Sequence, residues 1–150
     1  MNKTISTNRK APFEYEILEE FEAGLVLKGS EVKSIKESKT TIVGSYVKIL
    51  KGEVYIIGMK ISTYNFSREK IEEDRNRKLL LHKNEINKLI GAVERKGFSL
   101  IPLSIYIKDG YIKLNIALAR GKKLHDKRED LAKKAQKRDA ERDLKRKYNF

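Results

Sequence analysis

The sequence predicts a mainly β fold: a closed or nearly closed antiparallel barrel with flanking α-helices, followed by a disordered basic C-terminal tail. Three observations support this prediction. Apolar residues recur at every second position over several short segments, as expected of half-buried strands. Glycine-containing turns separate these segments, and near residue 120 the apolar positions give way to charged ones. Closing a small sheet into a barrel protects strand edges that would otherwise stay unpaired, and the oligonucleotide-binding (OB) fold is the natural candidate.

The first predicted strand follows a polar N-terminal segment. Residues 1–12 show no periodicity and are expected to be disordered. Beyond them, apolar positions alternate with glutamates, which predicts a half-buried strand with Gly24 at a bulge or bend. The strand then breaks, and Ser30 is suited to cap a short helix with Val32 and Ile35 on its inner side. The alternating apolar residues of the strand are Tyr15, Ile17, Phe21, Ala23, Leu25 and Leu27.

The middle of the chain predicts a hairpin, a loop and a helix. Residues 45–59 alternate around Lys51-Gly52, which indicates two strands joined by a glycine turn. Residues 61–77 are polar and charged, and we expect a long mobile surface loop, a feature that is often functional. In residues 83–96 the apolar side chains fall on one face of a 3.6-residue period, which predicts a helix. Gly97 suits the end of that helix.

The strongest local signal is Asp109-Gly110, a pair that favours a two-residue type I′ turn. Such a turn sets the register of the two strands, so Tyr106 is expected opposite Lys113. One face of this hairpin is then apolar and belongs to the core. The other face is basic and aromatic and carries Tyr106, Lys108, Tyr111, Lys113 and Asn115.

The charge of the chain argues for a polyanionic partner. It has 34 Lys and Arg against 21 Asp and Glu, a formal net charge of +13. Residues 120–150 hold 13 of these cations and 6 of the acids, so over half of the net charge lies in the last fifth of the chain. That segment has few apolar residues to bury. We expect it to be unfolded alone and to become helical once phosphates neutralise its charge.

Several classes of protein are excluded by what the sequence lacks. The absence of cysteine excludes a disulfide framework and a thiolate zinc site. Two distant histidines offer no metal site, and no phosphate-binding loop or nucleophile motif is present. Without a signal peptide or a run of about 18 apolar residues, we expect a cytoplasmic protein that does not enter membranes. These observations predict a non-enzymatic protein without cofactors that binds a polyanion, either RNA, DNA or an anionic membrane surface. Metal-dependent RNA cleavage by Glu16, Glu20 and Glu22 is the remaining enzymatic alternative.

Short motifs run through the chain in a fixed order. They are Phe21-Glu22-Ala23-Gly24, Gly29-Ser30-Glu31-Val32-Lys33-Ser34, Arg77-Lys78-Leu79-Leu80-Leu81, Gly121-Lys122-Lys123 and His125-Asp126-Lys127-Arg128. Each is weak alone, but the ordered set, which spans the chain from about residue 8, resembles the SmpB family of tmRNA-binding proteins. The resemblance implies that an OB-like barrel over residues 13–119 binds the tRNA-like domain of tmRNA. It also implies that the tail, residues 120–150, becomes helical on the ribosome.

The resemblance implies a place for that tail as well. In a stalled ribosome it would occupy the empty decoding centre and mRNA channel, next to small-subunit rRNA, so that trans-translation can begin. Six tail residues match the family's ribosome-facing segment, where a histidine stacks on a base and cations hold phosphates. These residues are Lys122, Lys123, His125, Asp126, Lys127 and Arg128.

On the barrel, the resemblance implies tmRNA contacts for Glu22, Leu80, His82 and Lys113. A carboxylate at position 22 would accept hydrogen bonds from base amino groups, and an exposed leucine would pack on an unstacked base. The hairpin register independently puts Lys113 on the outward face. The residues alone favour blander assignments: a solvated Glu22, a core Leu80 and a helix-capping His82. The family commonly has asparagine at position 82, and this sequence departs from that pattern with His82.

Two other functions fit the same features. A structural ribosomal protein, permanently bound to rRNA, would also be small and basic with a disordered tail. A general single-strand binder of the cold-shock type fits less well, because the outward aromatic side chains are few. Since a ribosome has one mRNA channel, we expect the protein to be a monomer.

Overall fold

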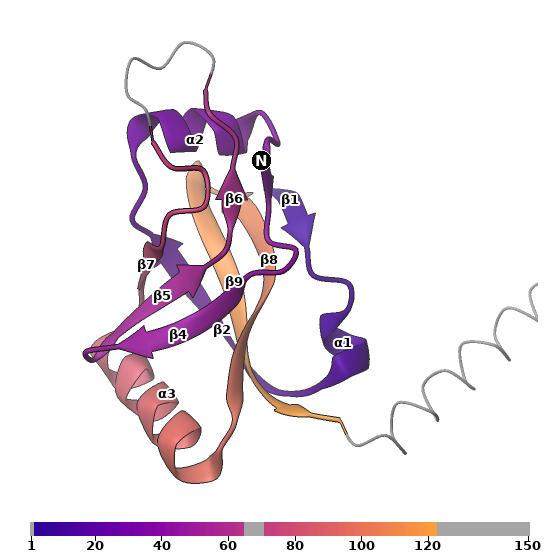
Figure 1. Ribbon diagram of the computed structural model, residues 1–150, viewed down its shortest axis with the longest axis vertical. Coiled ribbons are helices and arrows are strands. Elements are labelled where there is room, and N and C mark those ends of the chain that lie inside the picture. The colour runs from indigo at the N-terminus through magenta and orange to yellow at the C-terminus, as the bar shows by residue number, and fades with distance from the viewer. Residues whose placement is uncertain (1, 65–70, 123–150) are drawn as a thin grey trace, which may run out of the picture.

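The computed structural model describes residues 2–64 and 71–122 (Figure 1). In this part of the chain the mainly β prediction is confirmed. The strands are β1 (Lys3–Thr7), β2 (Tyr15–Leu25), β3 (Thr40–Thr41), β4 (Tyr46–Leu50), β5 (Glu53–Ile57), β6 (Lys60–Ile61), β7 (Arg77–Leu80), β8 (Ser99–Lys108) and β9 (Tyr111–Gly121). The helices are α1 (Ala11–Glu14), α2 (Gly29–Lys36) and α3 (Lys83–Lys96).

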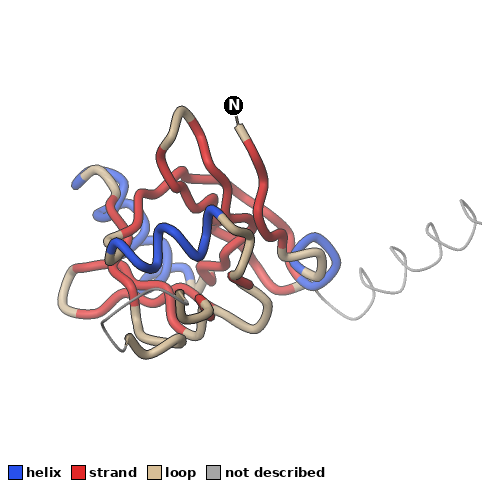
Figure 2. Tube along the Cα trace, turned by 90° about the horizontal axis from the view of Figure 1, so that it is seen from above, coloured by secondary structure: helices blue, strands red, loops and turns tan. Residues whose placement is uncertain are grey.

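Seven strands form one curved antiparallel sheet in the order β1-β8-β9-β2-β7-β5-β4, and β3 pairs with β6 separately. The sheet curls until β4 lies near β8, and α2 lies across its upper end (Figures 1 and 2). The predicted closed barrel is not confirmed. No ladder among the described residues joins β4 to β1 or β8, so β1 and β4 are edge strands. The main apolar core draws on β2, β4, β5, β7, β8 and β9, with α2 and α3 contributing Ile35 and Leu89.

The N-terminal segment corrects the prediction of disorder over residues 1–12. Lys3–Thr7 forms β1 and pairs with β8, and α1 follows. The cause is tertiary: β8 offers backbone hydrogen-bonding groups at its outer edge, Ile5 packs against the core, and Ala11 is buried. A polar segment without periodicity gives no local sign of such an edge strand, because strand formation depends on the partner that is present.

β2 confirms the predicted alternation, but its irregularity lies elsewhere. The register with β9 shifts between Ile17 and Glu19, a β-bulge that adds Leu18 to the strand. Gly24, the predicted bulge or bend, lies in a regular ladder opposite Leu80 of β7. A Cβ added at Gly24 would lie 3.3 Å from the Cβ of Leu80. Glycine at this position therefore allows β7 to approach β2 closely.

Both predicted hairpins are confirmed together with their turns. Lys51 and Gly52 join β4 to β5, and Asp109 and Gly110 join β8 to β9. All four residues have positive φ, as a type I′ turn requires. The predicted register of the β8–β9 hairpin is also confirmed.

β9 continues through Gly121, past the predicted start of the tail at residue 120. Arg120 lies opposite Glu16 in the ladder and forms an ion pair with it. The Lys122 backbone N–H then donates to the Glu14 carbonyl oxygen at 3.0 Å. The ordered β structure therefore extends beyond the boundary that composition indicated, because backbone pairing does not require apolar side chains.

The two longer helices follow the prediction with one correction. α3 spans Lys83–Lys96 as expected, and Gly97 ends it in the left-handed conformation, with φ of 66°. α2 begins at Gly29, one residue before the predicted cap at Ser30. Its first turn is instead closed by Glu31, whose carboxylate accepts the Lys28 backbone N–H at 2.9 Å. Ile35 points inward as predicted and is fully buried.

The predicted surface loop over residues 61–77 is wrong at both ends. Ile61 belongs to β6 and is only 2% exposed, and Arg77 begins β7 and is 0% exposed. The described positions between them, 62–64 and 71–76, form no helix or strand. The polar composition misled because the arginine at the end of this segment is buried with a charged partner.

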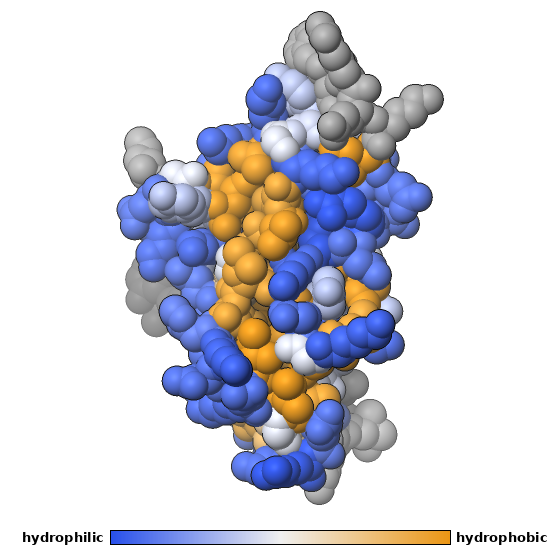
Figure 3. Space-filling model, turned by 90° about the vertical axis from the view of Figure 1, so that its left-hand side faces the viewer, coloured by the Kyte–Doolittle hydropathy of each residue, from blue (hydrophilic) through white to orange (hydrophobic). Residues whose placement is uncertain are grey.

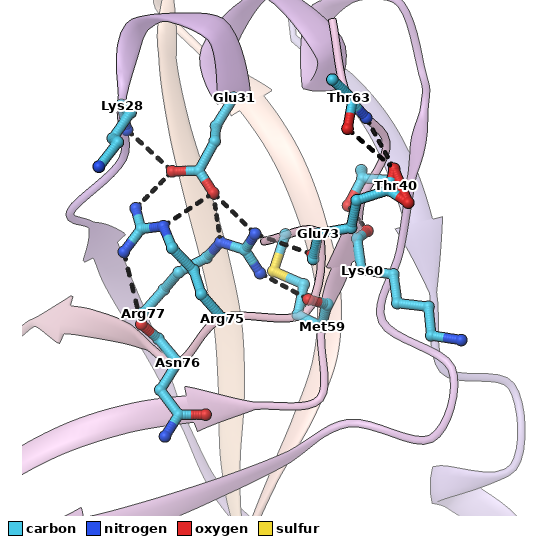
Figure 4. A network of polar contacts seen from close by, with 10 residues as sticks. All are labelled: Lys28, Glu31, Thr40, Met59, Lys60, Thr63, Glu73, Arg75, Asn76 and Arg77. Atoms are coloured by element: carbon cyan, nitrogen blue, oxygen red, sulfur yellow. Dashed lines mark hydrogen bonds and ion pairs between the residues drawn. The ribbon is translucent and has the colours of Figure 1, made fainter. Parts of the chain in front are cut away.

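That partner is Glu31 of α2 (Figure 4). Arg77 donates from Nε to Glu31 Oε2 at 2.8 Å, and its Nη1 and Nη2 donate to the carbonyl oxygens of Met59 and Glu73 at 2.5 and 2.9 Å. Arg75 adds a second cation, with its Nε 3.1 Å from Glu31 Oε2. Through these contacts the Glu31–Arg77 ion pair connects four parts of the chain: α2, the segment after β5, the 71–76 segment and β7.

The pKa of Glu31 reflects this setting. Burial by itself raises it, but hydrogen bonds from Arg75, the Lys28 backbone and Arg77 outweigh burial, so the pKa is lowered from its ordinary value of 4.5. A lowered pKa in the folded state stabilises the fold at pH values above that ordinary value. The stabilisation is lost as the pH falls through the lower folded-state pKa.

We expect Arg77→Met to lower the free energy of unfolding by about 3 kcal/mol, because it removes one cation from a buried carboxylate. Lys39→Ala is the matched control. The Lys39–Glu37 ion pair is 44% and 46% exposed, and its loss should cost at most about 1 kcal/mol. Urea denaturation of both variants measures the difference at unchanged m-value. Equal losses would contradict the structural role given to Arg77.

Candidate nucleic-acid interface

Four strands bring residues from distant parts of the sequence into one row. Tyr106 of β8 pairs with Lys113 of β9, which in turn pairs with Gly24 of β2. Gly24 also pairs with Leu80 of β7. Directly opposite residues of an antiparallel ladder point to the same face of the sheet. The row lies on the outside, which we call the outer face, because the adjacent residues in each strand are buried: Ala23, Leu79, Ile105 and Leu114.

Glu22 lies on the outer face, two residues before Gly24 in β2. The Tyr106 hydroxyl donates a hydrogen bond to Glu22 Oε2 at 2.6 Å, reaching across β9. The Nζ of Lys108 lies 3.4 Å from the same oxygen. Among the described residues, every contact of this carboxylate goes to Oε2. Its other oxygen, Oε1, is therefore left to accept hydrogen bonds from outside.

These contacts shift the pKa values of both partners. The hydrogen bond from Tyr106 is the main cause that lowers the pKa of Glu22 below 4.5, and Lys108 lowers it further. Burial raises the pKa of the Tyr106 phenol, and the hydrogen bond to Glu22 raises it again. At neutral pH the carboxylate is ionised and the phenol keeps its proton. Glu22 is thus an oriented acceptor, able to pair with amino groups of a nucleobase as no cation can.

Lys113 supplies a cation beside this acceptor. Its side chain is half-buried, and its Nζ lies 6.0 Å from the centroid of the Tyr111 ring. Within the described ranges Lys113 forms no ion pair with a carboxylate. Its charge therefore remains available to an external anion such as a phosphate.

Leu80 adds apolar surface to the same face. It is 53% exposed, which corrects the blander assignment to the core. Val26 continues the outward side of β2 and is 45% exposed, and its N–H donates to the Lys78 carbonyl oxygen at 3.0 Å. Figure 3 shows a continuous apolar stripe on the side of the molecule where β7 lies. An exposed apolar strip between hydrophilic flanks is typical of a binding surface.

His82 lies next to this surface, two residues after Leu80 and at the N-cap position of α3. Its backbone N–H donates to Glu85 Oε1 at 3.1 Å. Glu85 thus closes the capping box of α3, and His82 occupies the predicted capping position with an exposed side chain.

The outer face brings together residues that were named from the sequence as RNA-binding candidates, but one contact between them was missed. Tyr106 and Lys113 were paired by the turn at 109–110, yet nothing local showed that Tyr106 would reach Glu22. That contact depends on the register between β2 and β9, which are far apart in sequence. Of the predicted tail residues, Lys122 ends the described chain. The other five, Lys123, His125, Asp126, Lys127 and Arg128, lie outside the described residues.

The glutamates of β2 do not converge on a metal site. Glu16 pairs with Arg120, Glu20 accepts from Asn115, and Glu22 accepts from Tyr106. No group of three or more potential ligands that could hold a metal ion occurs in the described part of the chain. In the same part, no helix has the length and apolar character needed to cross a membrane.

Residues 5–146 match the family model described as "SmpB protein". An SsrA-binding protein of Lachnoclostridium phytofermentans is 50% identical over 147 residues, covering 95% of this chain and 94% of the relative. One from Gloeothece citriformis is 51% identical over 146 residues, covering 96% and 94%. A chain of the solved structure "tmRNA-SmpB: a journey to the center of the bacterial ribosome" is 45% identical, with a TM-score of 0.65, covering 83% of this chain and 92% of that one.

We expect Tyr106→Phe to raise the pKa of the Glu22 carboxyl toward 4.5, because the hydrogen bond that lowers it most is lost. Carboxyl-carbon NMR titration of the two proteins measures the change. Tyr111→Phe is the control, since Tyr111 makes no hydrogen bond to Glu22 among the described residues. An unchanged pKa in Tyr106→Phe would show that the contact does not hold the carboxylate in solution.

Proposed function

The chain belongs to the SmpB family, and on that premise we propose that it binds tmRNA and brings it to stalled ribosomes for trans-translation. The observation that carries the proposal is the outer face, which Glu22, Leu80 and Lys113 share. Glu22 and Lys113 are 91 positions apart in the sequence. Within tmRNA, the part that we propose the protein binds is the tRNA-like domain. The protein is an RNA-binding adaptor that works in the cytoplasm as a monomer and performs no chemistry itself.

The three side chains offer complementary contacts to a folded RNA. Lys113 neutralises a phosphate, which contributes affinity without regard to sequence. Glu22 accepts hydrogen bonds from exocyclic amino groups of an unpaired base. Leu80 packs against a base or sugar that has left its stack. His82, exposed at the edge of this surface, extends it toward α3.

The tail, residues 120–150, has a separate task in this proposal. It occupies the decoding centre and the vacant mRNA channel, with His125 stacking on a base and the cations at positions 122, 123, 127 and 128 holding phosphates. Asp126 begins the tail helix as its cap. Charge supports this division, since more than half of the net +13 lies in the tail. The nascent chain is then extended from the tmRNA reading frame and tagged for degradation.

We expect the protein to bind the tRNA-like domain of tmRNA at least about 100-fold more tightly than an ordinary tRNA at physiological salt, a difference of about 2.7 kcal/mol. Leu80→Ala should reduce this affinity about tenfold, because it removes an apolar contact with a base. Leu18→Ala is the matched control, as Leu18 is 40% exposed in the β2 bulge, away from the row. Fluorescence anisotropy measures the RNA affinity of the wild type and of both variants. Equal affinity for the two RNAs would instead favour a structural rRNA-binding protein.

Truncation after Lys122 should leave tmRNA affinity within about threefold of the full chain and abolish tagging of nascent chains on stalled ribosomes. The cut keeps β9 whole, including the Arg120–Glu16 ion pair and the Lys122–Glu14 hydrogen bond. The two readouts are RNA binding and a reconstituted tagging assay. Loss of tmRNA binding in the truncated protein would contradict the proposal that the outer face binds tmRNA and the tail binds the ribosome.

A further inference from the structure

A groove adjoins the outer face on the side where β7 and the β4–β5 turn lie (Figure 1). It runs between that turn, residues 78–81 and the first turns of α3, and has a volume of about 390 Å³. This volume is within the range of roughly 300–1,000 Å³ that small-molecule sites occupy. Leu80 lines the groove and also belongs to the outer face. The two surfaces are therefore continuous.

The groove has both apolar and polar lining. Leu80, Leu81 and Ile86 contribute apolar side chains to it. Asn87 of α3 also lines the groove and carries a carboxamide that both donates and accepts hydrogen bonds. Apolar side chains together with one amide group suit the face and the edge of a nucleobase.

Two lysines stand at the rim. Lys78 lies 3.4 Å from the carboxylate of Glu53, and both side chains are about 40% exposed, so a phosphate can compete for this screened ion pair. Lys83 makes no ion pair with any residue of the described ranges. Lys83 is therefore available to an anion that enters the groove, and Lys78 becomes available when the anion displaces Glu53, which also lines the groove.

We infer that this groove holds one unstacked nucleotide of the RNA bound on the outer face. Its base lies on Leu80 and Ile86 with an edge toward Asn87, and its phosphate lies between Lys78 and Lys83. The inference rests on the proposed function and extends the binding surface to positions on α3 and β7 that the family resemblance does not assign. An RNA strand that contacts Leu80 passes directly over the groove.

A protein occupant fits less well. A stable protein interface buries about 800 Å² on each partner and has an apolar centre from which charged residues are depleted. Here charged and polar residues, Glu53, Lys78, Lys83 and Asn87, line the groove together with the apolar ones. Charge complementarity thus favours a polyanion, and continuity with the outer face favours the RNA that this face binds.

The first test fills the groove. Asn87→Trp should weaken binding of the tRNA-like domain of tmRNA by tenfold or more, because the indole takes the place of the base. Chemical probing of the bound RNA should show that one nucleotide loses its protection while protection elsewhere is retained. Asn84→Trp is the matched control: it is an exposed asparagine of α3 that does not line the groove. This control should bind like the wild type.

The second test removes a charge without adding bulk. Lys83→Ala should weaken binding several-fold and reduce the slope of log affinity against log salt by about 0.7, the value for one phosphate of a single strand. Lys96→Ala, in the last turn of the same helix, removes the same charge away from the groove. It should leave the slope unchanged. Circular dichroism checks that all four variants are folded.

The outcomes separate this inference from the proposed function. If the wild type does not prefer the tRNA-like domain over tRNA, both fail. If the preference holds and Leu80→Ala weakens binding, but Asn87→Trp and Lys83→Ala match their controls, the inference alone is overturned. Dimerisation of the free wild type that Asn87→Trp abolishes would identify a second copy as the occupant and would also overturn it.

Discussion

The ion pair between Glu31 and Arg77 is the constraint on which the position of β7 depends. A buried charge is tolerated only when its partners satisfy it, and Arg77 finds such partners in α2, after β5 and in the 71–76 segment. These contacts fix the first residue of β7, and the ladders with β2 and β5 position the rest of this four-residue strand. Leu80, at its other end, is thereby carried to the outer face opposite Gly24.

Gly24 makes the second contribution to that surface. In the row that runs from Tyr106 to Leu80, it is the one position without a side chain, and the Cβ of Leu80 occupies the space beside it. A Cβ at this position would require Leu80 to shift by a few tenths of an ångström. The glycine thus acts through packing, since it lies in a regular ladder and the bulge of β2 is elsewhere.

Signals that act over a few neighbouring residues predicted the helices and hairpins that depend only on those residues. The α3 helix and the β8–β9 hairpin were predicted correctly, because periodicity and an Asp-Gly turn act over a few residues. The β1 strand, the burial of Arg77 and the Tyr106–Glu22 contact were missed, since each depends on a partner more than 40 residues away. For the site, resemblance supplied Leu80 and Glu22, and turn geometry supplied Lys113. Neither indicated how Glu22 is oriented.

That orientation bears on how a protein of net charge +13 recognises one RNA among many. Cations attract every RNA, so affinity from Lys113 or the tail carries little information about which RNA is bound. Discrimination has to come from groups that reward a particular arrangement of bases. In the proposed function and the further inference, the carboxylate bonded to Tyr106, the exposed Leu80 and the groove lined by Asn87 are such groups, and each would be left unsatisfied or empty by a duplex with all of its bases stacked. In the proposed function the ionised Glu22 is therefore a source of selectivity, because it repels any RNA that presents a phosphate where a base amino group is required.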